Sequence, residues 1–386
     1  MRILRLADVT GSLEGGMAGV MLHGGASLEQ LGHKVEYAFR EDLGPLARSG
    51  PARRLIAPFL AVREVLRRRR GGRSYDVVEI HEPLASLYCA LRKPLGLPPC
   101  VVLSHGLEVR GWAAQKDRWA SQGRRPSRKS QITVPLTLLS QARYALRHAD
   151  HVIVPTEEDR NYLLDNLGLP PGRVTQVDNG ASPMSSTHPH SSVNQPETVA
   201  VLFFASWIDR KGTRELIEAT SLLAESGVQF RLTVAGGNVP EAQIISGFPA
   251  STRHLVTVRS RVSRDEIPTL LAHHDVLVSP SWFEGMPLTV LEAAAGGLAL
   301  ILSDISGHRQ ILKAAEDQES SALVIPCHDS EALASAITRL YEDRELLKQL
   351  QVKARAIANL LTWRHAAEQL EAAYLSATGK PSSTTR

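Results

Sequence analysis

Short apolar runs alternate with segments of helical periodicity along almost the whole chain. In the first half, five apolar runs have the length and the Gly, Pro or polar flanks of buried strands. They are Ile3–Ala7, Lys34–Phe39, Asp76–Ile80, Cys100–Ser104 and His151–Val154. Between them, apolar positions recur with helical spacing over residues 17–31, 53–70, 84–93, 135–148 and 157–167. This alternation predicts a parallel sheet with helices on both faces.

A second series of the same kind begins after an interruption. Residues 180–196 are rich in Ser, Pro and Asn, a composition typical of an exposed linker. Further strands are expected at Val199–Ala205, Phe230–Ala235, Leu255–Arg259, Val276–Ser279, Ala299–Leu302 and Ala322–Ile325. Further helices are expected near residues 212–226, 264–273, 287–295, 330–341, 343–359 and 363–377.

The whole pattern predicts an α/β protein with two doubly wound, Rossmann-like domains. We expect residues 1–180 to form the first domain, 181–197 the linker and 198–362 the second domain. The helix within 363–380 is expected to cross back to the first domain. A chain of 386 residues is also long enough for two domains. Ligands of such sheets bind beyond the carboxyl ends of the strands, so we expect a site in a cleft between the domains.

The stretch from Gly106 to Pro135 lacks a clean periodicity. It contains Trp112, Trp119 and several basic residues. Loops of this length inside a compact domain are usually functional or disordered. We therefore expect a mobile loop over the cleft that meets the acceptor or a membrane.

The composition is that of a globular protein without a membrane-spanning helix. Hydrophobic residues make up 43% of the chain, and no run of eighteen apolar residues occurs. The first eight residues lack the apolar stretch of a secretory signal. The cysteines Cys89, Cys100 and Cys327 have no metal-ligand spacing and fit a reducing compartment. We expect a cytoplasmic protein.

Charge is distributed unevenly between the two halves. Residues 1–150 carry 24 Lys and Arg against 13 Asp and Glu, whereas the net charge of the whole chain is only +4. Basic residues concentrate in Arg63–Arg73 and Arg124–Lys129. Nucleic acid is not the expected partner, because the basic residues are not interleaved with aromatic residues that stack on bases. An anionic membrane at its inner face, an anionic lipid-linked substrate and a merely solvated basic face remain open.

The strongest chemical signal follows the expected strand Val276–Ser279. Its sequence is Ser281-Trp-Phe-Glu284-Gly285-Met286-Pro287-Leu288-Thr-Val-Leu-Glu292. Pro287 suits the first turn of a helix, because its missing N–H needs no partner there. The free N–H groups of such a helix start carry partial positive charge and can bind sugar hydroxyls and phosphate oxygens.

The spacing of Glu284 and Glu292 resembles the paired-glutamate motif of the family 4 (group 1) retaining glycosyltransferases, which have the GT-B fold. In that family the first Glu contacts the donor sugar and the second contacts the nucleotide ribose. Two glutamates at this spacing also occur by chance in helices. The preceding strand and the Ser-x-x-Glu-Gly-x-Pro-Leu context make the resemblance more specific, and it implies that residues 285–288 help to bind the donor.

A second segment, Ala205-Ser206-Trp-Ile-Asp-Arg210-Lys211-Gly212, follows the expected strand Val199–Ala205. It resembles the family's Gly-Arg-Leu-x-x-x-Lys-Gly, in which cations neutralise the diphosphate leaving group. Lys211 matches, but Ser206 stands where the family has Arg. The resemblance implies a role for Lys211 in phosphate binding, with Arg210 as a substitute for the missing cation. A solvated lysine at a helix start is the ordinary alternative.

The first half has two weaker motifs. Gly15-Gly16, before the first expected helix, resembles a loop that approaches the donor phosphates or the acceptor, although turns use glycine in any case. His105 and Glu108 follow the strand Cys100–Ser104, and His105 resembles the family's His beside the acceptor and donor sugar. A His there can orient a hydroxyl or take its proton. His81 follows the previous strand in the same way, with a structural role equally open.

Further similarities continue the family's order of motifs along the chain. Val154-Pro-Thr156 and Asn179-Gly180 match segments at strand ends, and Ser303–Gln310 resembles a Gly-Gly-x-x-Glu loop with Gln310 in place of Glu. No Asp-x-Asp motif occurs, so the charge of the leaving group is expected to be met by Lys211, N–H groups and helix starts, with no metal and no cofactor.

These observations favour a transferase that moves a hexose from a nucleotide-diphosphate sugar to a saccharide or lipid-linked acceptor, in envelope or exopolysaccharide synthesis. Retention by same-face attack is the expected stereochemistry. A sugar-nucleotide epimerase or hydrolase on the same fold is an alternative, because a fold does not determine a reaction. A non-catalytic sugar-nucleotide-binding protein is another, since Ser206 and Gln310 depart from the family.

Overall fold

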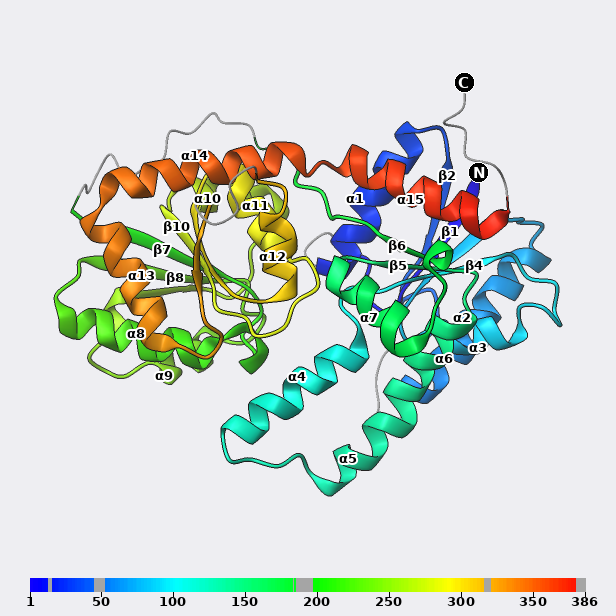
Figure 1. Cartoon of the computed structure of the whole chain (residues 1–386), viewed down its shortest axis with the longest axis horizontal. Helices are drawn as coiled ribbons and strands as arrows, with labels where there is room; N and C mark the ends of the chain where they lie inside the picture. Colours follow the sequence, from blue (N-terminus) through cyan, green and yellow to red (C-terminus); the bar gives the residue numbers. More distant parts are fainter. Residues whose placement is uncertain (13–15, 45–52, 183, 185–196, 316–320, 380–386) are drawn as a thin grey trace. The chain divides into compact units, whose positions relative to one another are not determined.

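The computed structural model describes the chain except for residues 13–15, 45–52, 183, 185–196, 316–320 and 380–386. Two compact units are present (Figure 1). The first contains Met1–Asn179 together with Trp363–Arg386, and the second contains Gly180–Thr362. Most of the predicted linker and Gly15 lie outside the described residues.

The first unit is built on a parallel sheet with the strand order β2-β1-β3-β4-β5-β6. Its strands are β1 Arg2–Leu6, β2 Lys34–Ala38, β3 Val77–His81, β4 Cys100–Leu103, β5 His151–Val154 and β6 Val174–Gln176. The helices around it are α1 Gly16–Gln30, α2 Arg53–Arg70, α3 Ser86–Leu91, α6 Ser140–His148, α7 Glu157–Leu167 and α15 Trp363–Thr378. The last helix, α15, packs against α1 and against β3, β4 and β5.

The second unit has a parallel sheet with the strand order β12-β11-β10-β7-β8-β9. Its strands are β7 Val199–Phe204, β8 Phe230–Ala235, β9 Val256–Arg259, β10 Val276–Ser279, β11 Ala299–Ser303 and β12 Leu323–Ile325. Its helices are α8 Thr213–Ser226, α9 Glu241–Gly247, α10 Ile267–Ala272, α11 Leu288–Gly296, α12 Ser306–Leu312, α13 Ser330–Glu342 and α14 Arg344–Leu360. The predicted α/β class with two doubly wound sheets is confirmed.

The prediction of a loop over Gly106–Pro135 is wrong. This stretch forms α4 Glu108–Ser121 and α5 Arg128–Val134, and a π-helical turn Pro135–Leu139 joins α5 to α6. Figure 1 shows α4 and α5 extending away from the sheet of their own unit. In α4 only Val109 and Arg118 are buried, and α5 has no buried residue. A helix that does not pack along a sheet needs no continuous apolar face, so its periodicity is weak.

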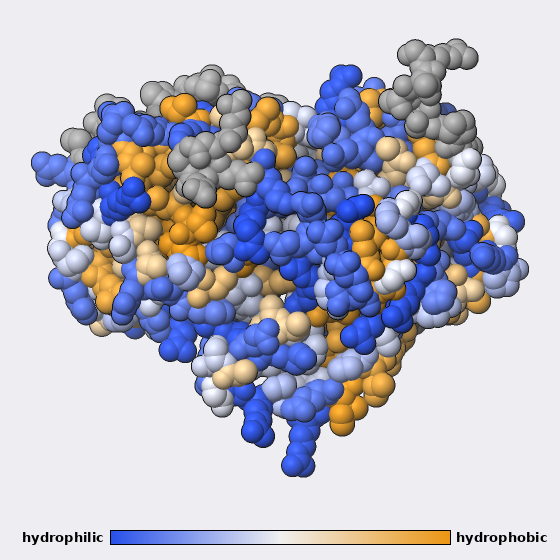
Figure 2. All heavy atoms as spheres, in the orientation of Figure 1, coloured by the Kyte–Doolittle hydropathy of each residue, from blue (hydrophilic) through white to orange (hydrophobic). Residues whose placement is uncertain are grey.

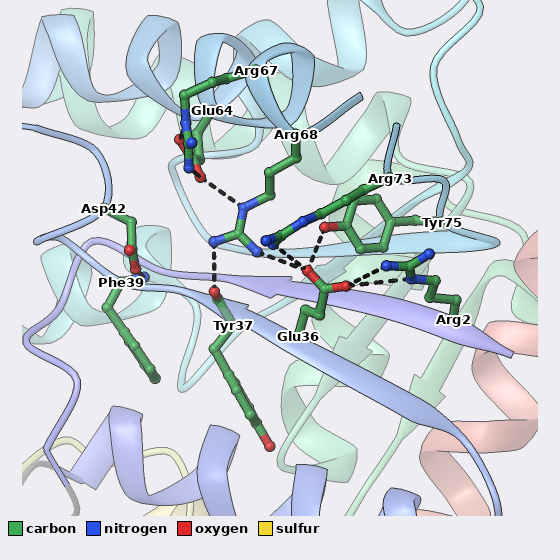
Figure 3. Close-up of polar contacts among 10 residues, drawn as sticks. All are labelled: Arg2, Glu36, Tyr37, Phe39, Asp42, Glu64, Arg67, Arg68, Arg73 and Tyr75. Atoms are coloured by element: carbon green, nitrogen blue, oxygen red, sulfur yellow. Dashed lines mark hydrogen bonds and ion pairs between the residues drawn. The ribbon is translucent and has the colours of Figure 1, made fainter. Parts of the chain in front are cut away.

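A network of charged side chains fixes α2 to the edge of the first sheet (Figure 3). The Glu36 carboxylate on β2 accepts hydrogen bonds from Arg2 at 2.9 Å, Arg68 at 3.2 Å, Arg73 at 2.8 Å and the Tyr75 hydroxyl at 2.7 Å. Burial raises the pKa of Glu36, but these donors outweigh burial and leave its pKa below the usual value. The basic cluster of this region is therefore partly a structural network.

The network also contains a second, buried carboxylate, that of Glu64 on α2. Its Oε1 accepts from Arg68 Nε at 2.7 Å, and Arg68 Nη2 donates to the Tyr37 carbonyl at 2.9 Å. Glu64 and Arg68 are both buried, whereas Arg67, which also contacts Glu64, is 66% exposed.

Among the described residues, no helix is both long enough and apolar enough to cross a membrane.

We expect Glu64→Leu to destabilise the protein by about 3 kcal/mol, because it removes the buried carboxylate that contacts Arg68 Nε at 2.7 Å and leaves only the longer ion pair with Glu36 at 3.2 Å. The free energy of unfolding in urea measures this loss. Arg67→Gln is the control, and it should cost less than about 1 kcal/mol since this arginine is exposed. Equal losses in the two variants would contradict the assignment of Arg68 as the buried partner.

Candidate active site

Two loops at the carboxyl ends of β7 and β10 bring three charged side chains together. A short 3₁₀ helix, Asp209–Lys211, follows β7, and Glu284 lies in the loop after β10. Lys211 Nζ lies 2.5 Å from Glu284 Oε1, and Arg210 Nη1 lies 3.3 Å from Glu284 Oε2. Arg210 thus points toward the same carboxylate as Lys211. The structure brings together three residues that the sequence proposed for one site.

Backbone contacts fix the two loops against each other. The Trp282 N–H donates to the Arg210 carbonyl at 3.1 Å, and the Trp282 indole N–H donates to the Asp209 carbonyl at 3.0 Å. Arg210 Nη1 also donates to the Phe283 carbonyl at 2.5 Å. Gly212 has φ +77°, and a Cβ there would lie 2.2 Å from the Pro280 carbonyl oxygen. Only glycine permits this close approach, so Gly212 positions Lys211.

The charge state of the cluster follows from its surroundings. Burial alone would raise the pKa of Glu284, but Lys211 and Arg210 outweigh burial and hold that pKa at about 2. The carboxylate is therefore ionised at neutral pH. Two cations around one carboxylate leave a local net charge of +1, which suits an anionic ligand.

The segment after Glu284 leads into α11. Pro287 is the residue immediately before the helix, which begins at Leu288, one position later than expected. Met286 is buried, and Gly285 packs so closely on α12 that a Cβ at Gly307 would lie 1.8 Å from the Gly285 carbonyl oxygen. The Ser303–Gln310 segment, expected as a loop, includes the first five residues of this helix, α12 Ser306–Leu312. Its first residues therefore support the Glu284 loop.

A neutral histidine lies behind this loop. His308 on α12 contacts the Ser279 hydroxyl at 3.1 Å and the Ser303 carbonyl at 2.8 Å. Burial lowers the pKa of His308 to about 4, although Glu284 acts in the opposite direction. An Nδ1–H donating to the Ser303 carbonyl fixes this ring, so His308 supports the strand ends without adding charge.

Glu292 lies on the buried side of α11 and has a partner that the sequence did not indicate. Arg264 Nη1 lies 2.7 Å from Glu292 Oε1, and Arg264 Nη2 donates to the Ser182 hydroxyl at 3.0 Å. Burial raises the pKa of Glu292, and the pairing with Arg264 opposes that rise. Arg264 comes 28 positions before Glu292, and no spacing rule would have connected them.

A pocket beside these loops is open at the carboxyl ends of β8 and β9. Its volume is about 670 Å³, and its walls are Asn238–Glu241, Val258–Arg261 and Glu266. Asn238, at φ +59°, donates to the Ser206 hydroxyl at 3.3 Å. The segment expected to contact a nucleotide base, near Val258–Val262, lines this pocket. Ser206 is half-buried and lies beside it.

In the first unit, His105 lies in the loop after β4 and contacts His81. His105 Nε2 is 2.8 Å from His81 Nδ1, and His81 Nε2 is 3.2 Å from Glu79 Oε1. Glu108 opens α4 and is half-buried, and Gly16 is the exposed first residue of α1. The sequence placed His81 and His105 at neighbouring strand ends, but did not indicate Glu79.

Of two weaker motifs, one has a structural role and the other lines a pocket. The Thr156 hydroxyl caps α7 by accepting the Asp159 N–H at 3.1 Å. Asn179 lines a small pocket that His105 and Trp363 also line. Within the described ranges, no group of three or more His, Cys, Asp or Glu side chains has the arrangement of a metal site.

Family models match both halves of the chain. A model described as "Glycosyltransferase Family 4" matches residues 14–183, and one described as "Glycosyl transferases group 1" matches residues 186–357. Among curated relatives, the D-inositol 3-phosphate glycosyltransferase of Saccharomonospora viridis is 25% identical over 321 residues, which are 77% of this chain and 69% of the relative. An Escherichia coli UDP-Gal:alpha-D-GlcNAc-diphosphoundecaprenol alpha-1,3-galactosyltransferase is 23% identical, over 70% of this chain and 68% of the relative.

Solved structures share the fold over nearly the full length. The sucrose-phosphate synthase of Thermosynechococcus elongatus superposes with a TM-score of 0.78 at 20% identity, covering 96% of this chain and 97% of the other. The Alr3699/HepE protein of Anabaena, solved with UDP and glucose, superposes with a TM-score of 0.67 at 18% identity, covering 96% and 98%. With both family models matched in sequence and the two sheets in place, this chain belongs to the group 1, family 4 glycosyltransferases of the GT-B fold.

Proposed function

We propose that this glycosyltransferase moves a hexose from a nucleotide-diphosphate sugar to a saccharide or lipid-linked acceptor, with retention of configuration and without a metal ion. The observation that carries the proposal is the contact of both Lys211 and Arg210 with the buried carboxylate of Glu284. It supplies an anion-binding centre of fixed geometry beside a polar carboxylate in the second unit.

The donor's diphosphate fits the cationic side of this cluster. When the bond between sugar and phosphate breaks, negative charge develops on the leaving oxygen, and positioned cations stabilise that charge. Lys211 is 16% exposed and Arg210 is 36% exposed, so both remain accessible to a ligand. Arg210 supplies the second cation that the family places at the Ser206 position. Glu284, acceptor-only when ionised, is suited to sugar hydroxyls.

The rest of the donor fits the neighbouring groups. The pocket between Asn238 and Glu266 is large enough for a nucleobase and is lined by Val258–Arg261. Glu292, oriented by Arg264, is suited to accept hydrogen bonds from the two ribose hydroxyls. Two relatives support a uridine nucleotide, because the Anabaena structure contains UDP and the E. coli relative is named for UDP-Gal.

A lipid-linked acceptor is supported by relatives and by the surface of the first unit. The E. coli relative and one from Campylobacter jejuni are both named for diphosphoundecaprenol acceptors. The turn between α4 and α5 carries the exposed cations Arg124, Arg125, Arg128 and Lys129. Figure 2 shows hydrophobic surface along the part of the α4–α5 arm next to this hydrophilic tip.

The hydrophobic surface has contributions from two segments that are distant in sequence. Ile132 and Leu136 are 60% and 71% exposed, and Leu55 and Phe59 on α2 are 59% and 58% exposed. The π-helical turn Pro135–Leu139 contacts α2, so the two pairs belong to one region. Cations beside exposed apolar side chains suit an anionic membrane surface. We propose that the enzyme is cytoplasmic and that this surface contacts the inner face of the membrane peripherally.

Replacement of the central carboxylate tests the transfer function directly. We expect Glu284→Gln to reduce kcat/KM for transfer by about 10²- to 10³-fold, as for loss of one positioned group at a charged transition state. Lys211→Met should act similarly, because it removes a cation from the leaving phosphate. The assay is release of nucleoside diphosphate in the presence of acceptor.

The control for these variants is Arg214→Ala, which removes an exposed ion pair with Glu218 on the same unit and should leave kcat/KM unchanged. Full activity in Glu284→Gln would favour a binding protein without catalysis. Donor consumption that is independent of acceptor would favour the hydrolase or epimerase alternative. An inverted anomeric product, determined by NMR, would contradict retention.

Glu292→Gln should mainly weaken donor binding. We expect the KM for the donor to rise about tenfold, equivalent to about 1.4 kcal/mol, with kcat changed less than twofold. The reason is that a ribose contact is made equally in the ground state and the transition state. Glu218→Gln, an exposed carboxylate on α8, is the matched control. A fall in kcat at constant KM would disagree with a ribose role.

Charge removal at the α4–α5 turn tests the membrane proposal. Replacing Arg124, Arg125, Arg128 and Lys129 by Gln should weaken binding to anionic vesicles by about 1 kcal/mol per cation. Vesicle sedimentation measures binding, with uncharged vesicles for comparison. The control removes four exposed cations elsewhere, Arg214, Arg231, Lys348 and Arg364. Equal losses in both variants, or no binding by the unmodified protein, would contradict a specific surface.

A further inference from the structure

A buried chain of hydrogen bonds runs from the centre of the first sheet to His105. Arg5 on β1 donates from Nε to Glu79 Oε1 at 2.8 Å, and the Tyr374 hydroxyl on α15 donates to Glu79 Oε2 at 2.6 Å. His81 Nε2 contacts Glu79 Oε1 at 3.2 Å, and His81 Nδ1 contacts His105 Nε2 at 2.8 Å. The side chains of Arg5, Glu79, Tyr374 and His81 are fully or almost fully buried. Arg5, Glu79 and Tyr374 therefore do not reach bulk water.

The Glu79 carboxylate is the fixed point of this chain. Arginine is always protonated in proteins and donates only, so Arg5 requires Glu79 to be the acceptor. Burial raises the pKa of Glu79, but Arg5 and His81 outweigh burial and hold the pKa well below its usual value. Since an ionised carboxylate cannot donate, the contact with His81 is a hydrogen bond from His81 Nε2–H to Glu79.

The hydrogen bond from His81 to Glu79 determines the direction of the hydrogen bond between His81 and His105. Burial lowers the pKa of His81 despite the opposite effect of Glu79, and Arg5 lowers it further. A neutral imidazole with its proton on Nε2 has a lone pair on Nδ1. The contact of 2.8 Å between His81 Nδ1 and His105 Nε2 then requires His105 to donate. Burial and His81 also lower the pKa of His105, so His105 carries one proton.

Two glycines on α1 leave space for side chains of the first sheet, Gly24 for Arg5 and Gly25 for Tyr37. A Cβ at Gly24 would lie 3.2 Å from Arg5 Nη1, and a Cβ at Gly25 would lie 1.9 Å from the Tyr37 hydroxyl. Arg5 Nη1 also donates to the Met21 carbonyl at 2.6 Å. The helix therefore leaves space for the guanidinium that keeps Glu79 ionised.

We infer that Glu79, through His81, sets His105 in the tautomer with the proton on Nε2 and the lone pair of Nδ1 available to substrate. The inference rests on the proposed transfer function, and it makes Glu79 and His81 positioning residues. His105 in this form accepts a hydrogen bond and cannot donate one from Nδ1. Its ligand is consequently a donor group, a saccharide hydroxyl, and not a phosphate oxygen of either substrate.

Nitrogen NMR of histidine-labelled protein tests the tautomer without any activity assay. In the free protein, both His81 and His105 should have a protonated Nε2 and an unprotonated Nδ1. Arg5, Glu79 and Tyr374 do not change charge near neutrality, whereas burial raises the pKa of Glu82, the neighbour of His81, to about 8. The spectrum should therefore be constant from about pH 6 to 7, below the titration of Glu82. Spectra of His81→Phe and His105→Phe assign the two rings.

Steady-state kinetics of three variants test whether the hydrogen bond between His81 and His105 affects transfer. His81→Phe should lower kcat about tenfold, as expected for a lost hydrogen bond of about 1.4 kcal/mol, and leave the donor KM within twofold. His81→Gln should restore part of kcat, because its side-chain oxygen can accept from His105. His148→Phe, an exposed histidine on α6, is the control and should change neither value.

The outcomes separate this inference from the proposed function. A protonated Nδ1 or a cationic ring at His105 would overturn the inference, and so would an unchanged His105 spectrum in His81→Phe. An equal fall in kcat for His81→Gln and His81→Phe would also overturn it. A wild-type protein that binds no nucleoside diphosphate sugar would overturn the proposed function, while leaving the NMR result intact.

Discussion

The carboxylate of Glu284 is buried, and its burial is tolerated because Lys211 and Arg210 contact its two oxygens. This ion cluster determines the backbone around it. Gly212 permits the loop after β7 to touch Pro280, and Trp282 donates twice to the Asp209–Arg210 backbone. These contacts fix the two loops against each other, so under the proposed function the charges are in place before a donor binds. A preorganised arrangement of this kind needs little rearrangement as the leaving group becomes charged.

The first unit contains buried charge of a different kind. Arg5 and Glu79 form an ion pair inside a parallel sheet, where desolvation makes ionic groups costly unless each is well paired. A chain of two histidines connects this pair to the loop after β4, so a permanent charge inside the unit determines which nitrogen of His105 carries a proton. Under the proposed function, the second unit supplies cations for a phosphate, and the first unit supplies a neutral acceptor for a hydroxyl.

The sequence predicted most strands and helices, and it missed the strand β6 and the helices α4, α5, α9 and α12. Continuous apolar runs such as Val276–Ser279 marked eleven of the twelve described strands, whereas the three-residue strand β6 has no such run. Helix α4 was missed because it packs along no sheet. Within the site, the loops of Lys211 and Glu284 were predicted from local motifs. Arg264 and Tyr374 were not, because their carboxylate partners lie 28 and 295 positions away in the chain.

Helix α15 completes the first unit although the second unit precedes it in the chain. During synthesis, Arg5 and Glu79 leave the ribosome early, but the Tyr374 hydroxyl that bonds Glu79 Oε2 emerges 295 residues after Glu79. Until then the sheet lacks the helix that packs on β3, β4 and β5. The nascent first unit is consequently incomplete while the second unit folds, and a ribosome that stops before residue 363 releases a product with an uncovered sheet.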